Sequence, residues 1–225
     1  MILFKHALKH SFAQPVNILV IFILPFAALF IPFEVGGLPF GLSFYGLFNL
    51  FSAFLLSRLI VEDRSNKIII RISSAPISYF QYLGSYLLAF LLILVIQNTI
   101  FTLATYFYWG DVVLNYGLLL ILYLLYSIMT ISFSLCWNSF FRAYNISFAL
   151  FTGVASVMCL ISGVSIPLQV FPGSIRSKVM ILPTYWLPSG LVAIYNGKII
   201  DVIFSYIVLL VYGGILLLLG SKRRY

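Results

Sequence analysis

The amino-acid sequence predicts an all-α integral membrane protein with six transmembrane helices, an interfacial helix at the amino terminus, and a proline-interrupted segment before the last span. The first observation is composition: 63% of the 225 residues are hydrophobic and 8% are charged, against about 25% charged in soluble proteins. The second is a mean hydropathy of +1.12. The third is length, because one span needs roughly 20 apolar residues and the chain therefore holds about six.

Residues 1–14 predict a short amphipathic helix that lies along the inner surface of the membrane. Lys5 and Lys9 are displaced to one side of this helix. Three apolar side chains recur every four residues and share one helical face: Phe4, Leu8 and Phe12. Membrane lipid is therefore an expected partner.

Six apolar runs follow, and the first is interpreted as a retained helix because no small-residue cleavage site follows it. Pro25 lies within this first run and is expected to kink it. The predicted spans are residues 15–33, 40–61, 79–108, about 115–137, 145–164 and 199–220.

The distribution of basic residues predicts how these spans are oriented. If the amino terminus is cytoplasmic, ten of the 13 Lys and Arg residues fall on cytoplasmic segments, and the other three are Arg176, Lys178 and Lys198. Cytoplasmic loops retain Lys and Arg, so both termini are expected in the cytoplasm, with the protein in the cytoplasmic membrane. Because the charges follow the span ends, the net charge of +8 does not indicate a nucleic-acid partner.

The longest charged interval, residues 62–76, joins the second and third predicted spans and reads EDRSNKIIIRISSAP. A short helix with an isoleucine patch between basic residues could fill a groove on a soluble protein, the patch supplying affinity and the charges orientation. The residues concerned are Glu62, Asp63, Arg64, Lys67, Ile68, Ile69, Ile70 and Arg71. The alternative is an ordinary charged loop that only obeys the charge rule for cytoplasmic segments.

Residues 162–194 form an apolar run that four prolines and three glycines interrupt. Each proline removes a backbone donor and pushes the preceding residue out of helical geometry, so no single straight helix can form there. Such a segment is stable when it is buried in protein, lines a wet cavity or lies at the membrane interface. An irregular external loop between two spans is the alternative interpretation.

The order of residues in these two intervals resembles the ATP-binding-cassette type-2 (ABC-2) permease family. In 162–194 the matching residues are Ser162, Gly163, Val164, Pro167, Pro172, Gly173, Leu182, Pro183, Tyr185 and Trp186. Near the other interval they are Glu62, Asp63, Ser73, Ser74, Ala75, Pro76, Tyr82, Leu83 and Gly84. The sequence departs from the family at Asn66, which stands at the usual glycine, and in its unusually apolar isoleucine patch.

The resemblance implies that residues 1–225 are one transmembrane domain of an exporter, paired with a second copy or a homologous permease. It makes residues 62–76 a coupling helix that docks on a cytoplasmic ATPase subunit, which binds ATP and Mg. It makes residues 165–190 a re-entrant segment, with short re-entrant helices before the last span, on the external side. In this family the second and fifth spans line the interface between permeases, which suggests these pathway residues: Phe44, Phe48, Asn49, Phe51, Ser52, Ser156 and Met158. Core packing is the alternative role for each of them.

Catalytic chemistry within this chain is not expected. In the predicted topology no two carboxylates meet in the membrane, and no G-x-x-x-x-G-K-[ST] motif is present. His6 and His10 have the spacing of a helical metal pair but lack a third ligand nearby, so no metal site is expected. Cys136 and Cys159 are interpreted as small apolar core residues.

The predicted function is therefore that of a permease subunit, driven by a separate ATPase, with no cofactor of its own. A pathway of aromatic and small polar side chains without buried charge suits an amphipathic or hydrophobic substrate: a drug, an antimicrobial peptide or a lipid-linked molecule. A non-transporting membrane scaffold or immunity protein that acts by binding alone is the alternative.

Overall fold

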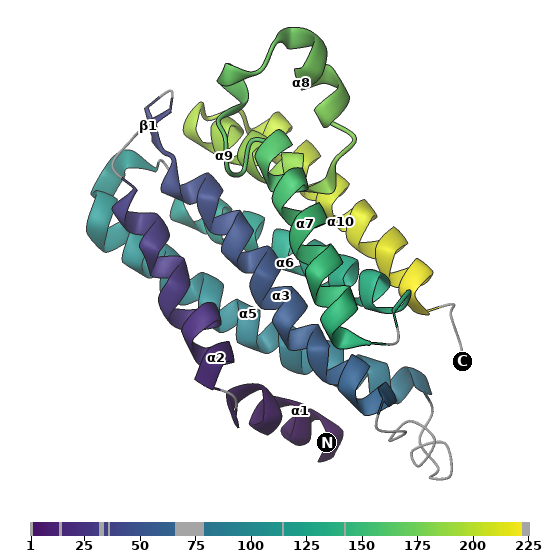
Figure 1. The fold of residues 1–225 in the computed structure, drawn as a ribbon. Helices are drawn as coiled ribbons and strands as arrows, with labels where there is room; N and C mark the ends of the chain where they lie inside the picture. Colours follow the sequence, from purple (N-terminus) through teal and green to yellow (C-terminus); the bar gives the residue numbers. More distant parts are fainter. Residues whose placement is uncertain are drawn as a thin grey trace.

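A computed structural model describes residues 2–13, 15–31, 34–35, 37–65, 79–113, 115–141 and 143–221 as an all-α bundle (Figure 1). Within these residues five helices are long and apolar enough to cross a membrane. They are α3 (Gly41–Ser65), α5 (Tyr79–Trp109), α6 (Tyr116–Asn138), α7 (Tyr144–Ile161) and α10 (Ile199–Ser221). Their bounds lie close to those predicted for the second to sixth spans.

The amino-terminal helix α1 (Ile2–Ala13) packs mainly on α5 and buries Ala7 completely. Figure 1 shows it across one end of the bundle, beside the start of α2 (Pro15–Ile18). This arrangement agrees with the short separate helix predicted for residues 1–14.

The first predicted span is helical but irregular. After α2 the chain forms a π-helix, Leu19–Ile23, and then a 3-10 helix, Leu24–Phe30. The amide of Leu24 donates to the carbonyl of Leu19, five residues earlier. Because Pro25 has no amide hydrogen, the regular α-helical pattern cannot pass through it, and the helix type changes at that point. At Pro25 the chain changes from one kind of helix to another, and the predicted kink stays a prediction.

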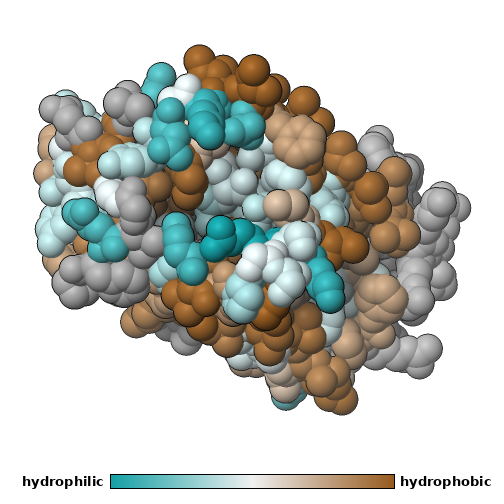
Figure 2. Space-filling model, turned by 90° about the horizontal axis from the view of Figure 1, so that it is seen from above, coloured by the Kyte–Doolittle hydropathy of each residue, from teal (hydrophilic) through white to brown (hydrophobic). Residues whose placement is uncertain are grey.

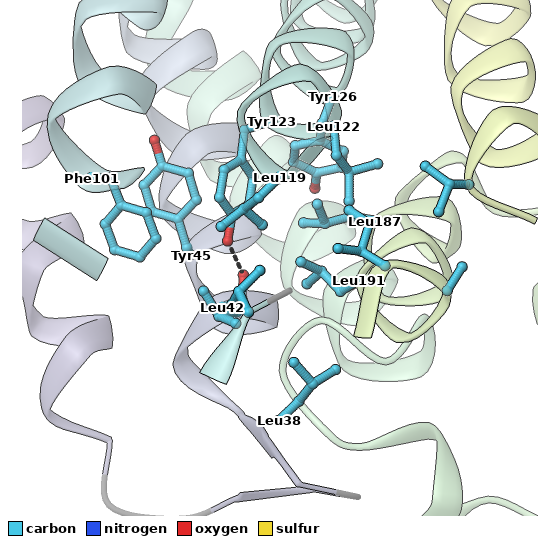
Figure 3. Packing of buried hydrophobic residues seen from close by; sticks show 14 of the residues in the cluster. Leu38, Leu42, Tyr45, Phe101, Leu119, Leu122, Tyr123, Tyr126, Leu187 and Leu191 are labelled. Atoms are coloured by element: carbon cyan, nitrogen blue, oxygen red, sulfur yellow. Dashed lines mark hydrogen bonds between the residues drawn. The ribbon is translucent and has the colours of Figure 1, made fainter. Parts of the chain in front are cut away.

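Helix α6 is the centre of the bundle, since it packs against α10, α3, α5 and α9 (Trp186–Tyr195). Aromatic side chains fill the space between these helices (Figure 3). The rings of Tyr45 and Phe101 stack with centroids 3.7 Å apart. The hydroxyl of Tyr123 donates to the carbonyl of Leu42 at 3.0 Å. The buried hydroxyl of Tyr123 thus has a hydrogen-bond acceptor, as buried tyrosines usually do.

A polar network joins α3, α5 and α6 inside the bundle. Asn98 Oδ1 accepts hydrogen bonds from Tyr45 Oη (2.6 Å) and Asn49 Nδ2 (3.0 Å). Asn49 Nδ2 also donates to Ser127 Oγ at 2.8 Å, while Asn49 Oδ1 accepts from Thr130 Oγ1 at 3.0 Å. All five side chains are fully or almost fully buried. In hydrocarbon, where water is absent, such a network holds helices in one register.

The opposite end of the bundle from α1 carries the short elements. Strands β1 (Glu34–Val35) and β2 (Leu38–Pro39) pair antiparallel, with Glu34 opposite Pro39. After α7 come a 3-10 turn, Leu168–Val170, then α8 (Gly173–Val179), a second 3-10 turn, Pro183–Tyr185, and α9.

Each proline of this segment stands at or near the start of a helical element. Pro167 and Pro172 precede the first 3-10 turn and α8, Pro183 opens the second turn, and Pro188 lies in the first turn of α9. At these positions the missing amide hydrogen costs nothing, because the first amides of a helix have no intrahelical acceptor. The prolines therefore divide the segment, as predicted, although α9 continues to Tyr195, beyond the predicted limit at residue 190.

Candidate functional site

The predicted pathway residues fall into a half-buried group and a fully buried group. The half-buried group lies on α3 and α7, two helices that pack against each other: Phe44, Phe48, Phe51, Ser156 and Met158. Phe44 and Phe48 pack edge to face at 5.4 Å, and Phe51 packs edge to face on Phe151 of α7 at 6.1 Å. Helix α7 is mostly unburied in the single chain, with Val154 and Val157 exposed.

Asn49 and Ser52 form the second group. Both are fully buried. Asn49 is part of the network to α5 and α6, and Ser52 Oγ accepts a hydrogen bond from Gln97 Nε2 at 3.3 Å. Both side chains form hydrogen bonds to other helices of the same chain. Such contacts agree with core packing, the alternative role given above for each pathway residue. The pathway role stays a prediction.

At the other end of α3 a buried carboxylate joins α3 to α5. Asp63 is 3% exposed, and its Oδ2 accepts hydrogen bonds from Tyr82 Oη at 2.7 Å and Tyr86 Oη at 2.8 Å. Hydrogen bonds to an ionised group are stronger than neutral ones. Two hydroxyl donors therefore offset the cost of removing this carboxylate from water, and they fix the ends of the two helices that flank residues 66–78.

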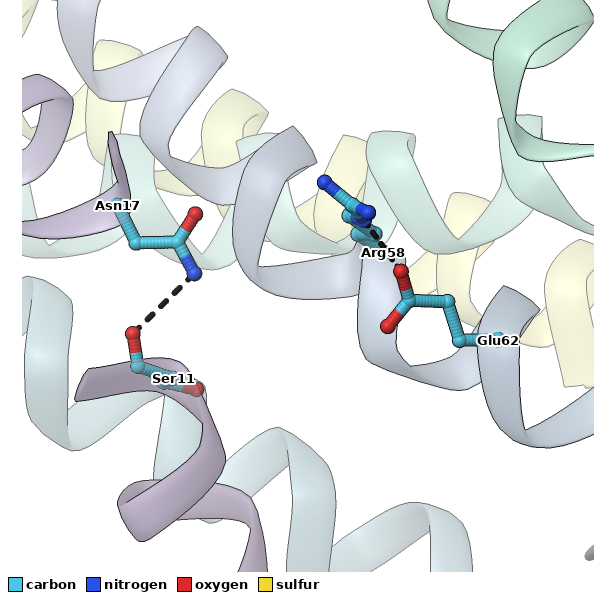
Figure 4. Close-up of polar contacts among 4 residues, drawn as sticks. All are labelled: Ser11, Asn17, Arg58 and Glu62. Carbon is cyan, nitrogen blue, oxygen red and sulfur yellow. Dashed lines mark hydrogen bonds and ion pairs between the residues drawn. The ribbon is translucent and has the colours of Figure 1, made fainter. Parts of the chain in front are cut away.

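One turn earlier, Arg58 Nε donates to Glu62 Oε1 at 2.5 Å, and its guanidinium carbon lies 4.7 Å from the ring centroid of Tyr144 in α7. Figure 4 shows this pair near the corner between α1 and α2, where Asn17 Nδ2 donates to the carbonyl of Ser11 at 3.1 Å. Both pairs border one small cavity. Arg58 thus joins α3 to α7 at this end of the bundle, close to the amino-terminal corner.

The predicted docking residues are only partly visible. Lys67, Ile68, Ile69, Ile70 and Arg71 lie outside the described residues, as does the side chain of Arg64. Glu62 is half-buried, and Asp63 faces the interior rather than the surface. The docking role of the segment stays a prediction.

Sequence reasoning did not identify the pairing of Asp63 with two tyrosines. Tyr82 and Tyr86 are four residues apart, which places them on one face of α5, and this spacing after an acidic helix end was the available signal. Neither tyrosine could be linked to Asp63 without knowing how α3 and α5 pack.

The residues of the predicted re-entrant segment are anchored to α10. Tyr185 is buried, and Trp186 Nε1 donates to the carbonyl of Met180 at 3.1 Å. Tyr212 Oη of α10 donates to the carbonyl of Ile181 at 2.7 Å. Pro172 and Gly173 are exposed at the start of α8, while Pro167 and Pro183 are half-buried.

No group of three metal-ligating side chains occurs among the residues that the structure describes. His6 and His10 stack on α1 with ring centroids 6.1 Å apart. Cys136 and Cys159 are buried, and neither forms a disulfide among the described residues.

Comparison with known protein families shows which family has this sequence pattern. The model of a family described as "ABC-2 family transporter protein" matches residues 16–222, nearly the whole chain. The chain belongs to the ABC-2 transporter family. A search of curated proteins found no match.

Membership explains the architecture described above. An ABC-2 protein is the membrane component of an ATP-binding-cassette transporter, and such a component works with an ATPase partner. The several long apolar helices agree with a multi-pass membrane protein. The resemblance identified from residues 62–84 and 162–186 is thereby confirmed.

Proposed function

We propose that this ABC-2 protein is the permease subunit of an exporter that moves an amphipathic or hydrophobic substrate out across the cytoplasmic membrane. Two cytoplasmic ATPase subunits supply the energy. Two permeases, identical or homologous, face each other and open their shared interface outward. Both termini lie in the cytoplasm, and the apolar run at residues 15–30 completes six spans with the five long helices.

The observation that carries this proposal is the seam between α3 and α7. Phe51 packs on Phe151 of α7 across it, Phe44 and Phe48 share a face of α3 with Phe51, and α7 presents exposed apolar side chains. No Asp, Glu, Lys or Arg occurs between Phe44 and Phe51 or between Ser147 and Ser162. An uncharged aromatic surface binds hydrocarbon and aromatic groups well and offers nothing to a bare inorganic ion.

Residues 62–76 are the proposed contact with the ATPase. Asp63, Tyr82 and Tyr86 tie together the two helices that enter and leave this segment, so a displacement of the segment is carried into α3 and α5. When ATP binding closes the two ATPases, the segment in each of the two permeases moves, and the shared interface opens to the other side of the membrane.

Transport by the reconstituted complex tests the proposal. The complex, purified from its native membrane, is placed in inverted vesicles and given fluorescent amphipathic peptides and dyes. We expect accumulation that requires ATP and stops with vanadate. Absence of both an associated ATPase and any ATP-dependent uptake would contradict the exporter function and favour the scaffold or immunity protein.

A further inference from the structure

A cavity of about 410 Å³ opens at the end of the bundle that carries α8. It lies between α8, α9 and α10, and its volume is within the range of about 300–1,000 Å³ typical of ligand pockets. Figure 2 looks onto this end and shows hydrophilic residues gathered in the middle of the face, with hydrophobic residues around them. The lining residues that matter most are Arg176, Trp186, Asn196, Lys198, Asp201 and Phe204.

The cavity carries both signs of charge. Arg176 Nη2 donates to the carbonyl of Leu168 at 3.0 Å, which orients the guanidinium and leaves its other donors available. Among the described residues no ion pair neutralises Arg176, Lys198 or Asp201. A ligand with one anionic and one cationic group can therefore find a partner for each group in the wall of the cavity.

The cavity also borders an apolar, unburied surface. Trp186 packs edge to face on Phe204 with ring centroids 5.3 Å apart. Phe204 is 55% exposed, and Ile203 and Ile207 of α10 are also exposed. Tryptophan is enriched at the membrane–water interface, and Trp186 begins the short helix α9 beside α10. The polar cavity is thus continuous with a surface suited to acyl chains.

We propose that this cavity binds the headgroup of a zwitterionic phospholipid that carries a phosphate and a primary ammonium, such as phosphatidylethanolamine. Arg176 and Lys198 receive the phosphate, for which a planar guanidinium is well matched. Asp201 accepts hydrogen bonds from the ammonium, and the acyl chains follow α10 beside Phe204. A choline headgroup lacks N–H donors for Asp201, and a glycerol headgroup lacks the cation. This site is independent of the transport function proposed above.

Native mass spectrometry of the purified full chain tests the site. The chain is delipidated in detergent and mixed with equal concentrations of phosphatidylethanolamine, phosphatidylglycerol and phosphatidylcholine. We expect preferential retention of phosphatidylethanolamine. Arg176→Gln and Lys198→Gln should each lower its affinity about tenfold, the effect of one lost charge-assisted contact. Asp201→Asn should remove the preference over phosphatidylglycerol while phosphatidylglycerol still binds.

Lys178→Gln is the matched control, since Lys178 is an exposed cation on α8 that does not line the cavity. It should bind lipid as the unchanged chain does. If it weakens binding as much as Arg176→Gln, the attraction is general electrostatics and the site is refuted. Equal retention of the three lipids, or an unchanged preference in Asp201→Asn, refutes it as well.

A competition experiment separates a lipid from a soluble ligand of the same chemistry. Glycerophosphoethanolamine, the headgroup without acyl chains, is added in equimolar amount to the lipid-bound chain. We expect no displacement, because the acyl chains contribute apolar contacts beside Phe204. Displacement would overturn the assignment to lipid and indicate a soluble phosphate-containing amine. Circular dichroism confirms that each variant is folded.

Discussion

Gly41 begins α3 where this helix touches the irregular first helical run. A β-carbon added there would lie 1.9 Å from the carbonyl oxygen of Ala28. Backbone, unlike the end of a flexible side chain, cannot move aside without shifting a whole element. Close approach of two helices is therefore the reason for glycine at this position.

Gly41→Ala should lower the unfolding temperature in detergent, at a cost of about 1 to 3 kcal/mol, the usual effect of overpacking. Gly153→Ala in α7 is the control, because a β-carbon there meets nothing within 4 Å. It should be neutral or slightly stabilising, since alanine is the better helix former by about 1 kcal/mol. Equal effects of the two changes would disprove the close contact.

Asp63 also acts at the scale of single residues. Tyr86→Phe removes one of its two hydroxyl donors and should destabilise the protein by about 1.5 to 3 kcal/mol, the range for a hydrogen bond to a charged group. Tyr106→Phe, on the same helix at a position 51% exposed, should change stability little. Thermal unfolding followed by circular dichroism measures both, and a stable Tyr86→Phe protein would show that Asp63 does not depend on this donor.

At the scale of elements, the five long helices were predictable because each is one apolar run with polar ends. Their bounds agree with the predicted second to sixth spans within a few residues. The first run was less predictable, since the position of Pro25 reveals an interruption but not whether a bend, a π-helix or a 3-10 helix accommodates it. The division of the α8–α9 segment followed from its prolines, whereas the limit of α9 at Tyr195 did not.

The chemical character of the candidate site was predictable from the sequence, but the direction of its side chains was not. The uncharged aromatic character of the second span can be read from the sequence. Which face of α3 meets α7 cannot be read, because α3 is apolar nearly all round and shows no clear periodic stripe. Asn49 and Phe48 are neighbours in sequence but lie on different faces of α3. Only packing against α5 and α6 separates their roles.

The segment between α3 and α5 gives a prediction at this same scale. Ile69→Asp places a charge in the proposed apolar anchor and should release the ATPase during co-purification and abolish ATP-driven uptake. Ile181→Asp, at the opposite end of the bundle on a side chain 74% exposed, is the control and should leave the ATPase bound. Retention of the ATPase by Ile69→Asp would remove this patch from the docking surface.

At the scale of the whole molecule, the helices alternate in direction, so the flanks of residues 66–78 and the end of α10 share one end of the bundle (Figure 1). The α8–α9 segment occupies the other end. The segregation of basic residues predicts that the first end is cytoplasmic.

Labelling of intact cells with a membrane-impermeant maleimide measures this orientation. Ser177→Cys, on exposed α8, should react, whereas Ser73→Cys should react only after the cells are opened. The unchanged protein serves as a blank, because Cys136 and Cys159 are both buried. The reverse pattern would invert the topology and leave the ATPase without its proposed contact.

Helix α3 touches both ends of this molecule. It has 25 residues and is about 37 Å long at 1.5 Å per residue. Near the end of α3 that begins at Gly41, Leu187 of α9 lies against Gly46, where an added β-carbon would be 2.2 Å from the leucine Cδ2. Because α3 packs on α9 at this end and leads into the proposed ATPase contact at the other, we expect a tilt of α3 that starts at the ATPase to reach α9 and the wall of the proposed lipid cavity.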